Sequence, residues 1–225
     1  MSTALEIHHI GEPLLCALLS HIAAEGRLGA LACVRHRECD LGSVTKANGT
    51  GTPTSFLPNV KLKPVQVAGT TYLFDGAHQV DILAVGAASS AFPIEAKLGV
   101  DRLSPAEFTK RFLLPVGLSK HSPPRVTGSM VALLMGGGAA PLGTTPLQAA
   151  IPGAPHLSTA WGLVIRAGTW AKWRMSEPPI GPNGHIFIFE QIASSYGPPA
   201  DFDTLVHQVV GRDFFSSWGL APHAG

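Results

Sequence analysis

Residues 78–99 of the chain read HQVDILAVGAASSAFPIEAKLG. Two apolar runs flank the small residues AASS, a pattern typical of two antiparallel strands joined by a short turn. Asp81 lies in the first run, and Glu95 and Lys97 lie in the second. Charged residues make up only 14% of the chain, so three of them inside apolar strands indicate a functional site.

Strand geometry predicts how these three charges are arranged. Side chains at positions i and i+2 of a strand point to the same face, so Glu95 and Lys97 should project together. Asp81 precedes Glu95 by 14 residues, and a hairpin with its turn at 87–90 would place the two carboxylates opposite each other. An ion-paired surface hairpin is the alternative, but both strands are apolar on either face.

Two carboxylates side by side repel each other unless one keeps its proton or a cation lies between them. Oxygen ligands and retained waters suit Mg²⁺ or Mn²⁺. Such an ion can activate water and stabilise the transition state of phosphodiester hydrolysis. Lys97 would orient the water and stabilise charge. A role as general base is the alternative. The two carboxylates keep the Lys97 ammonium charged, which opposes this role, but a bound metal would lower the pKa of Lys97 and so favour it.

The segments HQVDILAVG and FPIEAKLG resemble the PD-(D/E)XK nuclease superfamily, whose members have the restriction-endonuclease-like fold. The family pattern is an Asp at the start of one strand, a short turn, and Glu-x-Lys on the next strand. The resemblance implies that Asp81 and Glu95 bind the metal, that the main-chain carbonyl of Ala96 is a further ligand, and that Lys97 is the catalytic lysine. Val80 replaces the proline of the pattern, which leaves the chemistry unchanged.

Many members of this superfamily carry another glutamate on the first helix. Glu12 and Glu25 are the candidates here, and Glu25 at the helix end is slightly favoured. The resemblance covers residues 12–135, and residues 136–225 are interpreted as a C-terminal elaboration of the same domain. It implies a magnesium-dependent endonuclease that cuts DNA, RNA not being excluded, and leaves a 5′-phosphate and a 3′-hydroxyl. A homodimer acting in restriction, phage defence, recombination or repair is expected.

The remaining patterns predict a mixed α+β (α/β) fold with helices on both sides of a central mixed sheet. A helix is expected to begin at Pro105, with Ser104 as its N-cap and Glu107 completing a capping box, and to end near Pro115. The other expected elements are a helix at 12–29 with Pro13 in its first turn, a loop at 40–59, strands at 65–74, 78–86, 91–99, 125–138, 161–168 and 184–192, and a helix at 201–219.

The net charge of +1 gives no general signature of nucleic-acid binding. It mildly favours the alternative of a non-catalytic nucleic-acid-binding or assembly module on the same fold, whereas the intact acids and lysine argue against it. Basic side chains that could still contact phosphates are Lys110, Arg111, Lys120, His121 and Arg125, with Lys172 and Arg174 beside Trp170 and Trp173. A solvated face with both tryptophans in the core explains them equally well.

Three cysteines without a secretory signal or a membrane-spanning stretch predict a cytoplasmic protein with reduced thiols. The spacing Cys33-x-x-His36-x-x-Cys39 could hold zinc with His8, His9 or His21 as fourth ligand. It lacks the paired units of ordinary zinc sites, so reduced cysteines are preferred. His78 is interpreted as a strand-edge residue and Asp75 as part of an Asp-Gly turn.

Overall fold

A computed structural model describes residues 3–35, 39–47, 49–75, 78–86, 90–137, 150–151 and 156–196, with side chains from residue 11 onward. The helix predicted at 201–219 and most of the glycine-rich segment 135–147 lie outside the described residues. So do residues 87–89 of the expected turn and Gly76 of the Asp-Gly pair.

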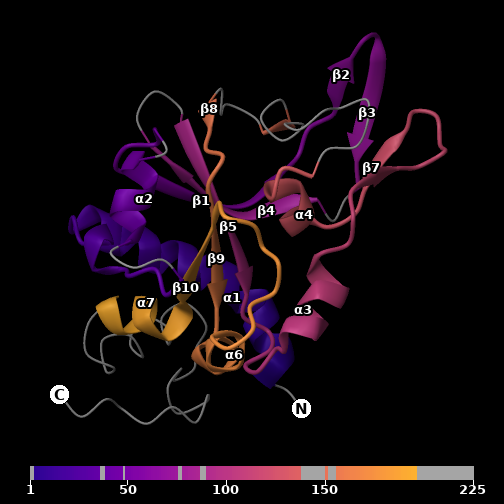
Figure 1. Ribbon diagram of the computed structural model, residues 1–225. Coiled ribbons are helices and arrows are strands. Elements are labelled where there is room, and N and C mark those ends of the chain that lie inside the picture. Colours follow the sequence, from indigo (N-terminus) through magenta and orange to yellow (C-terminus); the bar gives the residue numbers. More distant parts are fainter. Residues whose placement is uncertain are drawn as a thin grey trace.

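A mixed sheet forms the centre of the molecule, as the sequence predicts (Figure 1). β4 runs antiparallel to both of its neighbours, whereas β5, β9 and β10 run parallel to one another. The order is β1 (Ser55–Lys61), β4 (Gln79–Val85), β5 (Ser90–Lys97), β9 (Trp161–Ile165) and β10 (Gly184–Ile188), and β8 (His156–Leu157) pairs with the start of β5. The sheet therefore includes strands on both sides of residue 135.

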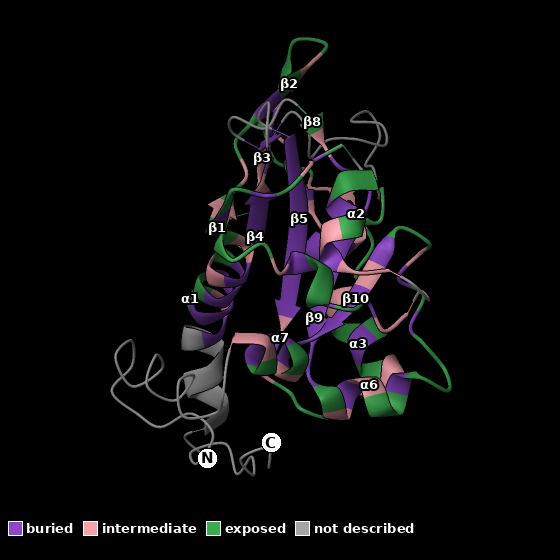
Figure 2. Ribbon diagram, turned by 90° about the vertical axis from the view of Figure 1, so that its left-hand side faces the viewer, coloured by how far each residue is buried: buried purple, intermediate pink, exposed green. Residues whose placement is uncertain are grey.

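Two hydrophobic clusters fill the space on the two faces of this sheet. β4 and β5 are buried along almost their whole length (Figure 2). One face is covered by α1 (Thr3–Ala24), the 3₁₀ turn η1 (Leu28–Ala30), α2 (Leu41–Ala47) and α7 (Phe189–Tyr196), and the other by α3 (Pro105–Phe112), α4 (Met130–Leu134) and α6 (Ala167–Trp173).

A smaller second sheet projects from the central one (Figure 1). Its order is β2 (Val65–Val67), β3 (Thr70–Phe74), β7 (Arg125–Thr127) and β6 (Gly117–Leu118). The single strand predicted at 65–74 is therefore wrong. Ala68 and Gly69 have φ of 48° and 80°, which makes a two-residue turn between β2 and β3. Of the three consecutive strands expected, β4 and β5 belong to the central sheet.

The helix starts were predicted unevenly. The capping box of Ser104 and Glu107 is confirmed, and α3 ends at Phe112. α1 begins at Thr3, so Pro13 lies inside the helix and its expected place in the first turn is wrong. The helix ends at Ala24, before the expected end at residue 29, and Gly26 follows it with φ of 70°. No helix among the described residues is long and apolar enough to cross a bilayer.

Three further segments differ from expectation. The loop predicted at 40–59 contains α2 and β1, and the Asp40 carboxylate accepts a hydrogen bond from the backbone N–H of Ser43 at the start of α2. The apolar run at 125–138 turns at Gly128 and becomes α4, which Ser129 caps. The strand at 184–192 ends at Ile188, where α7 follows. Short apolar runs fit a strand and a helix equally well, which explains why the helical parts of 125–138 and 184–192 were predicted as strand.

Gly86, at the end of β4, is a position where any side chain should unfold the protein locally. A Cβ there would lie 1.7 Å from the backbone carbonyl oxygen of Thr50. We expect Gly86→Ala to lower the free energy of unfolding by about 3 kcal/mol, because backbone has to move. Gly29→Ala is the control, since its Cβ meets only the Asp40 side chain at 3.8 Å. Equal denaturant midpoints for the two variants would contradict this close packing.

Candidate active site

The ladder between β4 and β5 stops just before the predicted acids. Ile82 and Ile94 are the last residues paired. Beyond them, carboxylate side chains accept hydrogen bonds from backbone N–H groups of the two strands. The Asp81 carboxylate accepts a hydrogen bond from the Ala96 N–H at 2.8 Å. The Asp81 N–H lies 3.4 Å from a Glu95 carboxylate oxygen. The two strands thus separate around the carboxylates, which opens the end of the sheet.

Lys97 joins the two acids. Its Nζ lies 2.9 Å from Asp81 Oδ2 and 2.7 Å from Glu95 Oε2. The exposed fractions of the side chains are 16% for Lys97, 9% for Asp81 and 1% for Glu95. The structure therefore brings the three residues together on one face, and each charge has an opposite charge in contact.

A cleft of about 940 Å³ lies over this cluster. Asp81, Glu95, Ala96 and Lys97 line it from the sheet, and Glu12 lines it from α1. Burial, followed by the charge of Asp81, raises the pKa of Glu12 to about 7, with Lys97 opposing the shift. Glu12 is thus within electrostatic reach of Asp81 and Lys97, and three carboxylates line the cleft together with the Lys97 ammonium.

Glu25, which the sequence analysis slightly favoured as the helix acid, does not reach the cleft. It lies beyond the opposite end of α1, where its carboxylate contacts the Arg27 guanidinium and accepts from His21 at 3.0 Å. The hydrogen bond from Arg27 lowers the pKa of Glu25. Of the two candidates, Glu12 is therefore the acid that lines the cleft together with Asp81 and Glu95. Its place in the first half of α1 followed from the true helix start, which the sequence did not reveal.

The electrostatics of the cleft favour an additional cation. Burial, followed by the charge of Asp81, raises the pKa of Glu95 to about 8, although Lys97 opposes this. Burial alone would lower the pKa of Lys97, but Glu95 and Asp81 outweigh it and raise that pKa above its ordinary value. Lys97 therefore remains an ammonium at neutral pH, which favours orientation and charge stabilisation over a role as base in the metal-free site.

In the metal-free protein the free energy of unfolding should fall as pH rises from about 5 to about 8. Over this range folded Glu12 and Glu95 keep protons that the unfolded chain, with an ordinary pKa of 4.5, has released. The folded state then binds more protons, so raising the pH favours unfolding. Lys97 is protonated in both states and adds no slope. Urea unfolding in EDTA measures this, and Glu95→Gln should flatten the curve. Stability that rises over this range would contradict the shifts.

An aromatic ring forms one wall of the cleft. Phe112, the last residue of α3, has Lys97 Nζ 5.5 Å and Arg111 Cζ 5.2 Å from its ring centroid. The ring is thus flanked by two cations. Sequence reasoning missed Phe112, although its position after the capping box on α3 placed it close to Arg111.

His78 also lines the cleft, where it is buried. Its Nδ1 accepts a hydrogen bond from the Asp75 N–H at 3.2 Å, and its Nε2 lies 3.0 Å from the Gly128 carbonyl oxygen. Both ring nitrogens are thus engaged by backbone groups of the second sheet. His78 therefore positions the cleft wall, and Asp75 contributes backbone contacts and pairs with Arg125 at 3.6 Å.

The basic residues proposed to contact nucleic acid are all exposed, but only one of them lines the cleft. Arg111 lines the cleft, whereas Lys110, Lys120, Arg125, Lys172 and Arg174 are not among the residues that line it. Trp173 is a core residue, whose Nε1 donates to the Leu103 carbonyl oxygen at 2.8 Å. Trp173 therefore cannot stack on a base, which agrees with the alternative that placed it in the core, and phosphate contacts of Lys172 and Arg174 stay a prediction.

The donor set of the cleft suits a hard divalent cation. Three carboxylates line it. Burial and the charge of Asp81 raise the pKa values of Glu12 and Glu95, so in the absence of a cation these two carboxylates hold protons that a metal ion would replace. Oxygen donors of this kind are what Mg²⁺ and Mn²⁺ prefer. No family profile, curated protein or solved structure matches the chain. The chemistry of the cleft is therefore the basis for assigning a function.

Proposed function

We propose that the protein is a metal-dependent nuclease of the PD-(D/E)XK type, with a restriction-endonuclease-like core, that hydrolyses phosphodiester bonds in DNA. The observation that carries the proposal is the convergence of Asp81, Glu95 and Lys97 at the floor of an open cleft. Apolar residues of similar volume usually contribute at least as much to the free energy of unfolding as a buried ion pair, so stability alone does not account for these charges. Burial next to a cleft favours a role in chemistry.

Each residue has a role in this proposal. Glu12, Asp81 and Glu95 would hold Mg²⁺ or Mn²⁺, with the carbonyl of Ala96 as the main-chain ligand that the family pattern implies. The bound ion would supply an activated water and positive charge at the scissile phosphate. Lys97 contacts both acids and faces the same cleft, so that its ammonium can orient the water and neutralise a phosphate oxygen.

The cleft also offers contacts for the substrate. Arg111 lies at its edge, and the guanidinium can pair with a phosphate next to the one that is cut. The ring of Phe112 lies close to both this guanidinium and the Lys97 ammonium, so both cations lie at the same wall. We propose that one DNA strand enters between α3 and the first half of α1, and that a homodimer in the cytoplasm provides one such site per strand.

Cleavage assays test the proposal directly. Plasmid DNA, single-stranded DNA and RNA are incubated with the protein in Mg²⁺, Mn²⁺, Ca²⁺ or EDTA. We expect cleavage with Mg²⁺ or Mn²⁺ and none in EDTA, with 5′-phosphate ends. Cleavage that persists in EDTA would contradict the site. Binding of nucleic acid without cleavage under every condition would favour the non-catalytic module.

Glu12→Gln and Glu25→Gln form a matched pair of variants that tests the role of the helix acid. The same change should lower cleavage by about ten-fold to a hundred-fold at Glu12, in the first half of α1, and leave it unchanged at Glu25, just after the helix. Glu12 lines the cleft, whereas Glu25 pairs with Arg27. The Mn²⁺ concentration giving half-maximal cleavage should rise for Glu12→Gln. Equal activities of the two variants would remove Glu12 from the ligand set.

A further inference from the structure

A second cluster of metal-ligating side chains lies on the opposite face of the central sheet. Cys33, Cys39 and His185 each offer one ligand atom, and the three atoms lie within 4.8 Å of one another. His185 shares its strand face with Phe187, which belongs to the hydrophobic cluster that also contains Cys33. None of the three residues lines the acidic cleft. The cluster is therefore separate from the proposed nuclease site.

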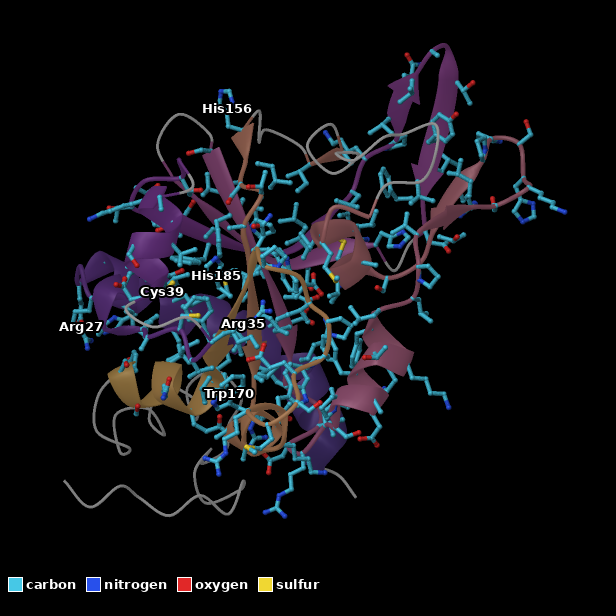
Figure 3. The ribbon with its side chains drawn as sticks, in the orientation of Figure 1. Arg27, Arg35, Cys39, His156, Trp170 and His185 are labelled. Carbon is cyan, nitrogen blue, oxygen red and sulfur yellow. The ribbon has the colours of Figure 1, made fainter. Side chains whose placement is uncertain are left out.

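The distance between Cys39 and His185 suits a tetrahedral ion with sulfur and nitrogen ligands. Cys39 Sγ lies 3.6 Å from His185 Nδ1. Bonds of about 2.3 Å from zinc to sulfur and about 2.0 Å to nitrogen, at the tetrahedral angle, separate the two ligand atoms by about 3.5 Å. Figure 3 shows Cys39 and His185 close together, reached from two segments that are distant in the sequence. Two thiols and one imidazole select Zn²⁺ over Mg²⁺.

Backbone contacts hold the ligands in place from both sides. The Cys33 N–H donates to the Cys39 carbonyl oxygen at 2.7 Å, next to an antiparallel bridge between Ala32 and Asp40. The Val34 N–H donates to the carbonyl oxygen of Ile186 at 2.9 Å, beside His185. The cysteine-bearing segment thus has its own pairing and is attached to β10, so a metal would find the three ligands already positioned.

Arg35 provides an independent attachment of the same segment. Its Nε lies 2.8 Å from Glu177 Oε2, and its Nη1 donates to the Gly184 carbonyl oxygen at 3.0 Å. Gly184 directly precedes His185. Polar contacts therefore attach this segment to β10 on both sides of the ligand cluster. A metal bound there would link the same two parts of the chain, which are distant in the sequence.

We propose that Cys33, Cys39 and His185 bind a Zn²⁺ ion that fastens the segment after η1 to β10. The sequence pattern favoured plain reduced cysteines because it lacks a paired unit, but it could not show His185, which is 146 residues from Cys39. His21, one suggested ligand, instead contacts Glu25 at 3.0 Å and the ring of Tyr196. A water molecule can complete three protein ligands. His36 lies outside the described residues, and the set does not depend on it.

Metal analysis of the full chain, with any affinity tag removed, tests the proposal. After dialysis against a weak chelator the wild type should retain about one zinc ion per chain. Cys39→Ser and His185→Asn should lose it. Cys16→Ser is the matched control, because Cys16 donates to the Phe56 carbonyl oxygen at 2.9 Å and lies outside the cluster. Asp81→Asn should also keep its zinc, which separates this site from the acidic cleft.

Two further measurements on the wild type do not require a variant to fold. Replacing zinc by Co²⁺ should give the absorption bands of tetrahedral thiolate coordination. Alkylation followed by mass spectrometry should modify Cys33 and Cys39 several times faster after a strong chelator removes the metal, with Cys16 unaffected. Zinc absent from the wild type, zinc retained by both ligand variants, or a disulfide between Cys33 and Cys39 in freshly purified protein would overturn the proposal.

Discussion

Asp81→Asn is expected to lower the rate of DNA cleavage by about 10³-fold and to abolish the stabilisation of the protein by Mn²⁺. Asparagine keeps the size of the side chain and the oxygen that accepts from the Ala96 N–H at 2.8 Å. It removes the negative charge of Asp81, which would bind a cation and which repels the charge of Glu95. The fold should therefore survive, while the site loses its central ligand.

Asp75→Asn is the control for this variant. It makes the same chemical change at an exposed acid whose carboxylate pairs with Arg125 at 3.6 Å and which is not among the residues lining the cleft. A surface pair of this kind contributes little, so cleavage and Mn²⁺ binding should stay close to wild type. Cleavage by Asp81→Asn at the control's rate, or unchanged Mn²⁺ binding by calorimetry, would remove Asp81 from the site.

The local part of the site could be predicted from sequence because it depends on short-range rules. Alternation along a strand puts Glu95 and Lys97 on one face, and a spacing of 14 residues puts Asp81 opposite Glu95 once the turn is fixed. The pairing of Ile82 with Ile94 follows the same register. The same rules do not predict that the pairing of β4 with β5 ends at this point. Here the carboxylates of Asp81 and Glu95 accept hydrogen bonds from backbone N–H groups that strand pairing would otherwise use.

The missing parts of the site depend on contacts between distant segments. β9 lies parallel to β5, and the pairing of Glu95 with Leu163 joins residues far apart in the sequence. No local pattern reports such a parallel neighbour, because its connection is long. Glu12 is a similar case, since its approach to Asp81 depends on how α1 crosses the end of the sheet. His185 is a third case, because it belongs to β10, the strand after β9, and approaches Cys39 from 146 residues away.

Lys97→Met should lower cleavage by about 10²-fold to 10⁴-fold, while Mn²⁺ stabilises the variant more than it stabilises the wild type. The ammonium lies 2.9 Å from Asp81 and 2.7 Å from Glu95, where it offsets their charge and competes with a metal. Methionine fills the same volume without the charge. The thermal shift caused by Mn²⁺ near pH 8, where Glu95 loses its proton, measures the difference.

Lys46→Met is the control, because Lys46 is exposed in the last turn of α2 and should change neither readout. The two readouts together separate the roles of the cluster. Asp81→Asn should lose both cleavage and Mn²⁺ stabilisation, whereas Lys97→Met should lose cleavage alone, since a lysine that acts on water and phosphate is not a ligand. If Lys97→Met loses both, the ammonium serves to hold the two acids in place. If it keeps full activity, the proposed catalytic role of Lys97 is wrong.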